Sequence, residues 1–398
     1  MKGYLVLFLT TMIFVQCGQI QKDHEHEDLN IFKYNESAGI SILDPANVTR
    51  FEDFIAVRHC YNGLVRLDEE MQLKPDLATS WEVKDSGRIY EFELREDVLF
   101  HNDECFTSDE QRKVTAEDVA FSLLRVSDPS NLTRGNFIFD GLDRSEKSNY
   151  KGIEVLSEYR LRIYLKEAQP SFLYQLSLPY GSVIPSEAID KYGDNISHHP
   201  VGTGPFKFKS WQRDSKLIFH KNEEYFEKDE EGNSLPYLDA INVTFIKDKG
   251  SEMIQFQKGN LHMLSGFGET QKENLLDENG SLKEELKDQF YLEKKPWLNT
   301  DYLGILMDER ITSKSDNPLS KKKVRQAIAH SIDLNTLIKY KRSGIGIPAN
   351  DGFVPSGMPN FDALKIKGYE YDLSKAKSLL SEAGYPCLLY TSPSPRDA

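Results

Sequence analysis

Cysteine is scarce in this sequence, and positively charged residues are outnumbered by negatively charged ones. The 398 residues include 4 cysteines, and none of these form a Cys-x-x-Cys pair, which excludes the usual zinc and thiol–disulfide motifs. The motifs His-Glu-x-x-His and Gly-x-Ser-x-Gly do not occur either, so the sequence carries no zinc-protease or serine-hydrolase signature. The formal net charge of −14 argues against a nucleic-acid-binding surface. We therefore expect no catalytic residues, no metal, no cofactor and no nucleic-acid partner.

Long hydrophobic runs are also missing, except for one near the N-terminus. Lys2 precedes an apolar run from Tyr4 to Val15 that only Thr10 and Thr11 interrupt. This run is short for a membrane span and has the length of a signal-peptide core. The sequence therefore predicts that the protein is exported.

The residues after this run indicate how the protein is held at the cell envelope. Gln16 and Cys17 follow the apolar core, which resembles a lipoprotein processing site, although a small residue is usual in place of Gln16. We predict a lipoprotein-type signal peptide over residues 1–17 and acylation of Cys17, whose lipid chains would anchor the protein to a membrane. The polar residues 18–30 would then form a flexible tether. A plain secretory signal or an uncleaved anchor is the alternative.

The hydrophobic pattern indicates two or three folded domains. Hydrophobic residues make up 39% and aromatic residues 11% of the chain, enough for real cores. Apolar residues that alternate, or that recur at helical spacing, predict the elements. Expected strands cover residues 31–34, 81–84, 89–95, 161–165, a hairpin over 207–221, 242–246 and 298–307. Expected helices cover or begin at residues 51–61, 115, 170, 185, 251–258, 320–337 and 372–384. This mixture without a repeat period predicts α/β layers.

A glycine-rich segment stands in the middle of the chain. Gly202 and Gly204 flank Thr203, and Pro205 precedes an alternating strand that begins at Phe206. Glycine permits a close approach of two backbones, and proline suits the first residue of a strand. No Gly-Lys-Ser/Thr follows, which excludes a phosphate-binding loop. We interpret the segment as a tight backbone crossing that leads into a strand, with an ordinary loop as the alternative.

Several other motifs accompany this crossing. They are Ser41–Pro45, Tyr61–Val65, Asn222–Phe226, Val324–Asp333 and Tyr371–Tyr385. Together with Pro200–Phe206 they resemble the bacterial family 5 solute-binding proteins, the peptide- and nickel-binding components of ABC importers. The resemblance runs from about residue 31 to residue 386. Glu104 and Met263 depart from it, because the family has glycine and aspartate at these places.

The resemblance implies a fold. It predicts an α/β protein with the two-lobed periplasmic binding protein type II architecture. Lobe I would comprise residues 31–58 and 196–265, with an inserted subdomain at 59–195. Residues 266–386 would form a partial second lobe, so the second lobe would be incomplete. Gly202, Thr203, Gly204 and Pro205 would form the hinge or crossing where the chain re-enters lobe I.

The resemblance also implies a function and a site. The protein would capture a solute, an oligopeptide in the first place, in a cleft between the lobes and deliver it to an ABC permease. Nickel or another small solute is the alternative ligand, and an exported hydrolase is a more distant alternative. The ligand-binding residues expected by position are Thr49, Arg50, Phe51, Asn136, Phe137, Trp297 and Asn299. The protein would be a monomer in the periplasm or cell envelope, lipid-anchored to the membrane.

The last residues of the sequence break the preceding pattern. A helix over 372–384 stops at Pro386, and residues 387–398 continue no periodicity. We interpret 387–398 as the translation of a sequencing adapter, with a genuine short C-terminus as the alternative. In the family, well over a hundred residues follow, including the acidic residue that pairs with a peptide's amino group. The chain is therefore expected to be C-terminally truncated and to bind peptides poorly or not at all.

Two cysteines and one histidine remain to be interpreted. Cys60 and Cys105 would form a disulfide in an oxidising periplasm or remain two separate buried thiols. His101 has no nucleophile or second histidine in its neighbourhood, so we expect it to be a structural residue in a turn.

Overall fold

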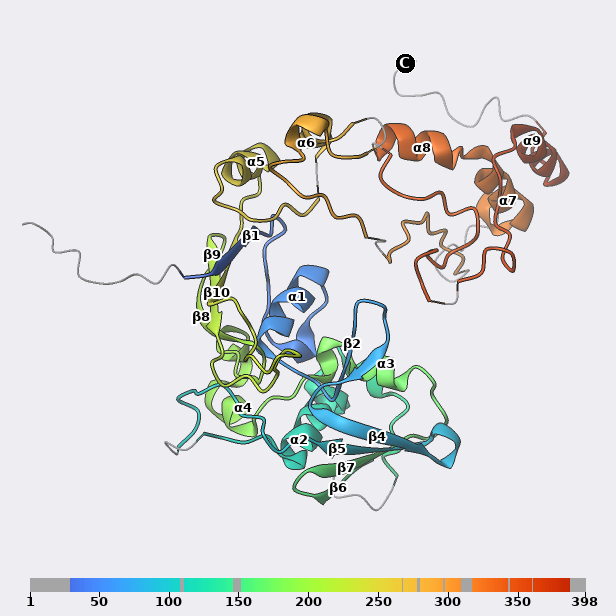
Figure 1. Ribbon diagram of the computed structural model, residues 1–398. Helices are drawn as coiled ribbons and strands as arrows, with labels where there is room; N and C mark the ends of the chain where they lie inside the picture. The colour runs from blue at the N-terminus through green and yellow to red at the C-terminus, as the bar shows by residue number, and fades with distance from the viewer. Residues whose placement is uncertain are drawn as a thin grey trace, which may run out of the picture. The chain divides into compact units, whose positions relative to one another are not determined.

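The computed structural model describes residues 29–107, 111–145, 152–266, 268–277, 280–295, 298–308, 317–342, 344–359 and 361–386. The chain forms two compact units. The first contains the described residues up to Tyr34 together with Ile40–Leu64 and Asp76–Thr244. The second contains Asn35–Gly39, Val65–Pro75 and the described residues from Phe245 onward. Figure 1 labels most of the helices and strands of both units.

A four-stranded sheet organises one part of the first unit. Its strand order is β1-β10-β9-β8, formed by β1 (Ile31–Asn35), β10 (Ala240–Thr244), β9 (Lys216–Lys221) and β8 (Phe206–Gln212). Leu217 and Phe219 of β9 are fully buried. Helix α1 (Phe51–Cys60) covers this face, and the ring centroids of His59 and Phe219 are 5.3 Å apart. The strands come from the two stretches that the sequence predicts as lobe I.

A second four-stranded sheet lies within the stretch predicted as the insertion. It has the order β4-β5-β7-β6, formed by β4 (Ala78–Lys84), β5 (Ile89–Leu94), β7 (Arg160–Tyr164) and β6 (Ile153–Ser157). All neighbouring strands are antiparallel. Tyr90 and Phe92 are buried on the face that α2 (Ala116–Ser127) covers, because apolar residues alternate with charged ones along β5. Helices α3 (Phe172–Leu176) and α4 (Ser186–Tyr192) complete this part.

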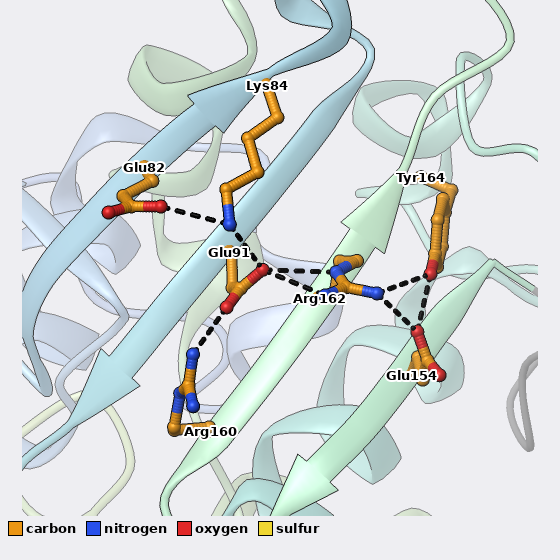
Figure 2. A network of polar contacts seen from close by, with 7 residues as sticks. All are labelled: Glu82, Lys84, Glu91, Glu154, Arg160, Arg162 and Tyr164. Carbon is orange, nitrogen blue, oxygen red and sulfur yellow. Dashed lines mark hydrogen bonds and ion pairs between the residues drawn. The ribbon is translucent and has the colours of Figure 1, made fainter.

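The other face of this sheet carries a network of charged side chains. Figure 2 shows its members, Glu82, Lys84, Glu91, Glu154, Arg160, Arg162 and Tyr164. Glu91 lies at the centre and is only 7% exposed. It accepts hydrogen bonds from Lys84 Nζ at 2.9 Å and from Arg162 Nη2 at 3.0 Å. These cations lower the pKa of Glu91 to about 2, so its carboxylate stays ionised.

Local sequence signals set several element ends. Asp118 accepts hydrogen bonds from the Thr115 N–H at 2.8 Å and the Thr115 hydroxyl at 2.9 Å, and this cap starts α2 where the sequence predicts a helix. Asp333 and Asp372 cap the helices that follow them, each accepting a hydrogen bond from a backbone N–H three residues later. Short 3-10 turns occur at Pro45–Asn47 (η1), Asp85–Gly87 (η2), Pro129–Asn131 (η3), Asn136–Phe139 (η4), Pro179–Gly181 (η5), Gly193–His198 (η6), Glu284–Leu286 (η7) and Pro318–Ser320 (η8).

The second unit combines a short hairpin with helices. Its elements are β2 (Val65–Leu67), β3 (Leu73–Pro75), α5 (Lys249–Gln257), α6 (Glu269–Leu275), α7 (Lys322–Ser331), α8 (Leu334–Lys341) and α9 (Leu373–Glu382). Val324 and Ala327 of α7 and Ala376 of α9 are buried where these two helices pack together. The predicted mixture of helices and strands is confirmed, and none of the helices within the described ranges has the length and hydrophobicity to cross a bilayer.

One predicted strand is wrong. Residues Leu298–Met307 form no strand, and Tyr302 and Leu303 are 72% and 74% exposed. An apolar run becomes a strand only when a neighbouring strand takes up its backbone hydrogen bonds, and no described strand pairs with this one. The two alternatives for the cysteines are also resolved, since Cys60 and Cys105 are both buried free thiols.

Candidate ligand-binding site

A buried ion pair fixes the loop before α1. Asp44 caps the turn η1, accepting hydrogen bonds from the Ala46 N–H at 3.1 Å and from Asn47 Nδ2 at 2.8 Å. Nη1 and Nη2 of Arg125 donate to Oδ1 and Oδ2 of Asp44, at 2.9 and 2.8 Å. Asp44 is 2% exposed, and a bidentate pair of this kind is strong and directional. The loop that contains Thr49 is therefore attached to helix α2.

The same loop is bonded to two other turns of the first unit. The Gly135 N–H donates to the Ala46 carbonyl at 3.1 Å, just before η4. The Tyr180 hydroxyl, in η5, donates to the Val48 carbonyl at 2.8 Å. Three sequence segments that are far apart thus meet at one place.

The Tyr180 ring lies at the centre of this meeting point. The Phe54 ring of α1 and the Phe137 ring of η4 both contact it edge-on, with centroid distances of 5.8 and 5.7 Å. A Cβ atom on Gly135 would come within 2.4 Å of the Tyr180 ring, so only glycine fits there. We call this arrangement of Phe54, Gly135, Phe137 and Tyr180 the Tyr180 cluster.

Four of the residues predicted to bind ligand lie on elements that pack together around Tyr180. Thr49 is exposed, and Phe51 and Phe137 are 51% and 57% exposed. Arg50 is half-buried and forms an ion pair with Glu52, with 3.5 Å between Nη2 and Oε2. All of these residues lie on the loop before α1, on α1 itself or on η4.

The remaining predicted residues differ in their situation. The Asn136 amide donates to the Ser127 carbonyl at 3.2 Å, so its N–H closes the C-terminal end of α2. Asn299 belongs to the second unit, where its amide nitrogen lies 3.4 Å from Asp301. Trp297 and Cys17 lie outside the described residues. Their predicted roles therefore stay predictions.

The glycine-rich segment forms the expected close crossing. A Cβ atom on Gly202 would lie 2.1 Å from the Cys60 carbonyl oxygen, and one on Gly204 would lie 2.5 Å from the Cys60 carbonyl carbon. The Gly204 N–H donates to the Cys60 carbonyl at 2.9 Å, and the Thr203 hydroxyl to Asn62 Oδ1 at 3.0 Å. Pro205 stands directly before β8. The segment joins the end of α1 to the start of a strand, while its hinge role remains a prediction.

His101 locks this crossing in place. The backbone N–H of His101 donates to the Gly202 carbonyl at 2.7 Å. The ring nitrogen Nε2 lies 2.9 Å from the Gly204 carbonyl, which can only accept, so Nε2 is the protonated ring nitrogen. The side chain is 4% exposed, and burial lowers its pKa to about 4. A buried, neutral imidazole that donates through Nε2 suits the structural role expected from the sequence, although its Nδ1 has no hydrogen-bond partner among the described residues.

One hollow lies elsewhere in the described chain. It has a volume of about 360 Å³, belongs to the second unit and is lined by Ser281, Leu282, Lys287, Phe290, Tyr291, Leu292 and Lys294. None of the predicted binding residues lines it. Within the described ranges, no group of three or more His, Cys, Asp or Glu side chains is arranged to hold a metal ion.

Sequence reasoning missed the residues that hold the site together. Arg125 lies 81 positions from Asp44, and Tyr180 lies 132 positions from Val48. Such long-range partners leave no local spacing signal. The only local hint is the Ser41–Pro45 motif, which contains Asp44 but does not show its ion-pair partner.

The chain is similar in sequence to a known protein family and to several of its members. The model of the bacterial extracellular solute-binding proteins, family 5 (middle), matches residues 72–391. The glutathione-binding protein GsiB of Shigella flexneri is 28% identical over 385 residues, which cover 96% of this chain and 66% of that protein. The heme-binding protein A of Haemophilus influenzae is 28% identical over 406 residues, covering 97% of this chain and 69% of that protein. The chain thus spans about two thirds of the length of these relatives.

Solved structures agree with the sequence matches. The periplasmic binding protein DppA of Helicobacter pylori, in complex with the peptide STSA, aligns with a TM-score of 0.69 and 28% identity. The alignment covers 89% of this chain and 66% of that one. The murein tripeptide binding protein MppA of Escherichia coli aligns with a TM-score of 0.68 at 19% identity, which supports the fold alone. The predicted fold, an α/β protein of the two-lobed periplasmic-binding-protein kind, is confirmed. The chain belongs to the bacterial extracellular solute-binding proteins of family 5.

Proposed function

We propose that this protein captures a solute, in the first place an oligopeptide, and delivers it to an ABC permease. The relatives are named for binding glutathione, heme or a peptide, and all of them are binding proteins, which supports a role without catalysis. We also propose export to the periplasm or cell envelope, a lipid anchor on Cys17 and a monomeric state. The predicted signal peptide supports the first two of these proposals.

The observation that carries the proposal is that the loop containing Thr49, Arg50 and Phe51 is fixed by contacts with other parts of the first unit. The buried Asp44–Arg125 pair and the Tyr180 hydroxyl hold its backbone, while Thr49 and Phe51 stay exposed. A site that is already ordered loses less entropy when a ligand binds. Each hydrogen bond to a peptide backbone adds only about 0.5–1.5 kcal/mol net, so several must act together.

Binding can be measured on the full chain. Saturation-transfer NMR with a mixture of two- to five-residue peptides should show transfer to the peptides, with dissociation constants near 1 mM, or about −4 kcal/mol. Thr49→Ala combined with Phe51→Ala should abolish the transfer. Tyr237→Ala is the matched control, because Tyr237 is an exposed aromatic residue of the same unit whose hydroxyl donates to Asp229. An absence of transfer to every peptide would contradict the proposal.

A further inference from the structure

Three exposed aromatic residues of the first unit belong to elements that pack around Tyr180. Among the described residues of that unit, four aromatic side chains are exposed: Phe51 (51%), Phe137 (57%), Tyr174 (45%) and Tyr237 (61%). The first three belong to α1, η4 and α3. Only Tyr237 comes from a different part of the unit. We call Phe51, Phe137 and Tyr174 the aromatic shelf.

The elements beneath the aromatic shelf are joined to one another. Phe51 stands one helical turn before Phe54, whose ring contacts Tyr180, and the Phe137 ring contacts Tyr180 from another side. Helix α3, which bears Tyr174, packs against both η4 and η5. Three segments that pack together therefore each carry an exposed aromatic residue.

Hydrogen bonds reinforce this base. Arg58 of α1 donates to the Ser177 carbonyl at the end of α3, at 3.1 Å. The Tyr180 hydroxyl donates to the Val48 carbonyl at 2.8 Å. Exposed apolar side chains scattered singly need no explanation, but a group on an ordered base usually marks an interaction site.

We propose that the aromatic shelf is the subsite for an apolar side chain of the bound solute, so that the substrate class is peptides containing an aromatic or large aliphatic residue. The inference rests on the proposed function. Thr49 and Arg50 directly precede Phe51 and offer a hydroxyl group and a guanidinium group to a peptide backbone. Binding sites commonly combine such a few polar groups with an apolar, aromatic lining. A peptide with an apolar side chain matches both parts of this segment.

The test compares four peptides on the full chain. Affinities of Ala-Phe-Ala, Ala-Leu-Ala, Ala-Ser-Ala and Ala-Glu-Ala are measured by NMR titration. We expect the phenylalanine and leucine peptides to bind about tenfold more tightly than the serine peptide, which corresponds to 1.4 kcal/mol. Phe137→Ala should reduce this preference at least threefold, about 0.65 kcal/mol, and Tyr237→Ala should leave it unchanged.

The outcomes separate this inference from the proposed function. Measurable and equal binding of all four peptides would overturn the aromatic subsite and leave the proposed function standing. Binding of none of them would contradict the proposed function and the subsite together. Analytical sedimentation tests whether a second copy of the chain occupies the aromatic shelf instead of a peptide. If Phe137→Ala changes self-association and not the peptide preference, the aromatic shelf is a contact between copies of the chain, and the inference is wrong.

Discussion

Replacing Arg125 by methionine should loosen the loop that bears the candidate site. The substitution leaves the Asp44 carboxylate buried without its cation, and removing one partner of a buried pair typically costs 3–5 kcal/mol. Asp44 would keep its hydrogen bonds from Ala46 and Asn47, so we expect a loss near the lower end, about 3 kcal/mol. That is a large share of the about 5–15 kcal/mol that stabilises a typical domain.

Urea unfolding of the full chain measures this loss, and hydrogen exchange locates it. Exchange at residues 45–50 should accelerate in Arg125→Met before the rest of the first unit is affected. Arg88→Met is the control, because Arg88 is 51% exposed in its pair with Asp85 and should cost less than about 1 kcal/mol. Adding Asp44→Asn to Arg125→Met should recover part of the loss, since no buried charge then remains unpaired. A loss below about 1 kcal/mol with unchanged exchange would refute the anchoring role of this pair.

Three other predictions concern pH and the crossing. Burial lowers the pKa values of His59 and His101 to about 4, so the unfolded chain binds protons at a higher pH than the folded chain does. The contribution of these two residues to the free energy of unfolding should be fully present above about pH 6.5 and should be lost as the pH falls towards 4. The expected loss is about 3 kcal/mol for His101 and less for the partly exposed His59. Melting temperatures from pH 7 to 4 test this, and His101→Gln should flatten the curve. The lowered pKa of Glu91, about 2, also makes stability fall with falling pH, but at lower pH: the stabilisation by Glu91 is present above about pH 4.5 and is lost towards pH 2. In urea unfolding at pH 7, Glu91→Gln should reduce the free energy of unfolding by about 1–2 kcal/mol. This is less than the full pKa shift implies, because the cations around Glu91 are partly exposed. Gly204→Ala should destabilise by about 3 kcal/mol or more through its backbone clash, whereas Gly304→Ala, whose nearest neighbour would be 3.7 Å away, should have little effect; equal unfolding midpoints for the two would contradict the crossing.

The elements of the fold that short-range chemistry determines could be predicted from the sequence. Alternation of apolar and charged residues located β5, and apolar residues at helical spacing located α2 and α9. The close crossing at Gly202 and Gly204 followed from the residues that permit it. In these cases the information lies within a few positions of the element itself.

The failures share a physical cause, which is dependence on distant partners. The run Leu298–Met307 has the composition of a strand, but pairing decides whether a strand forms, and no described strand supplies it. The partnership of Asp44 with Arg125 and the position of Tyr180 depend on how separate segments meet. The sequence therefore located several binding-site candidates without the residues that hold them in place.

Hydrogen exchange with and without a bound peptide tests the central claim most directly. The full chain is compared with and without Ala-Phe-Ala at a concentration that occupies most of the protein. A solute held at the Tyr180 cluster should slow exchange at residues 48–54 and 135–139. Protection confined to the second unit, for example at residues 281–294, would contradict this site.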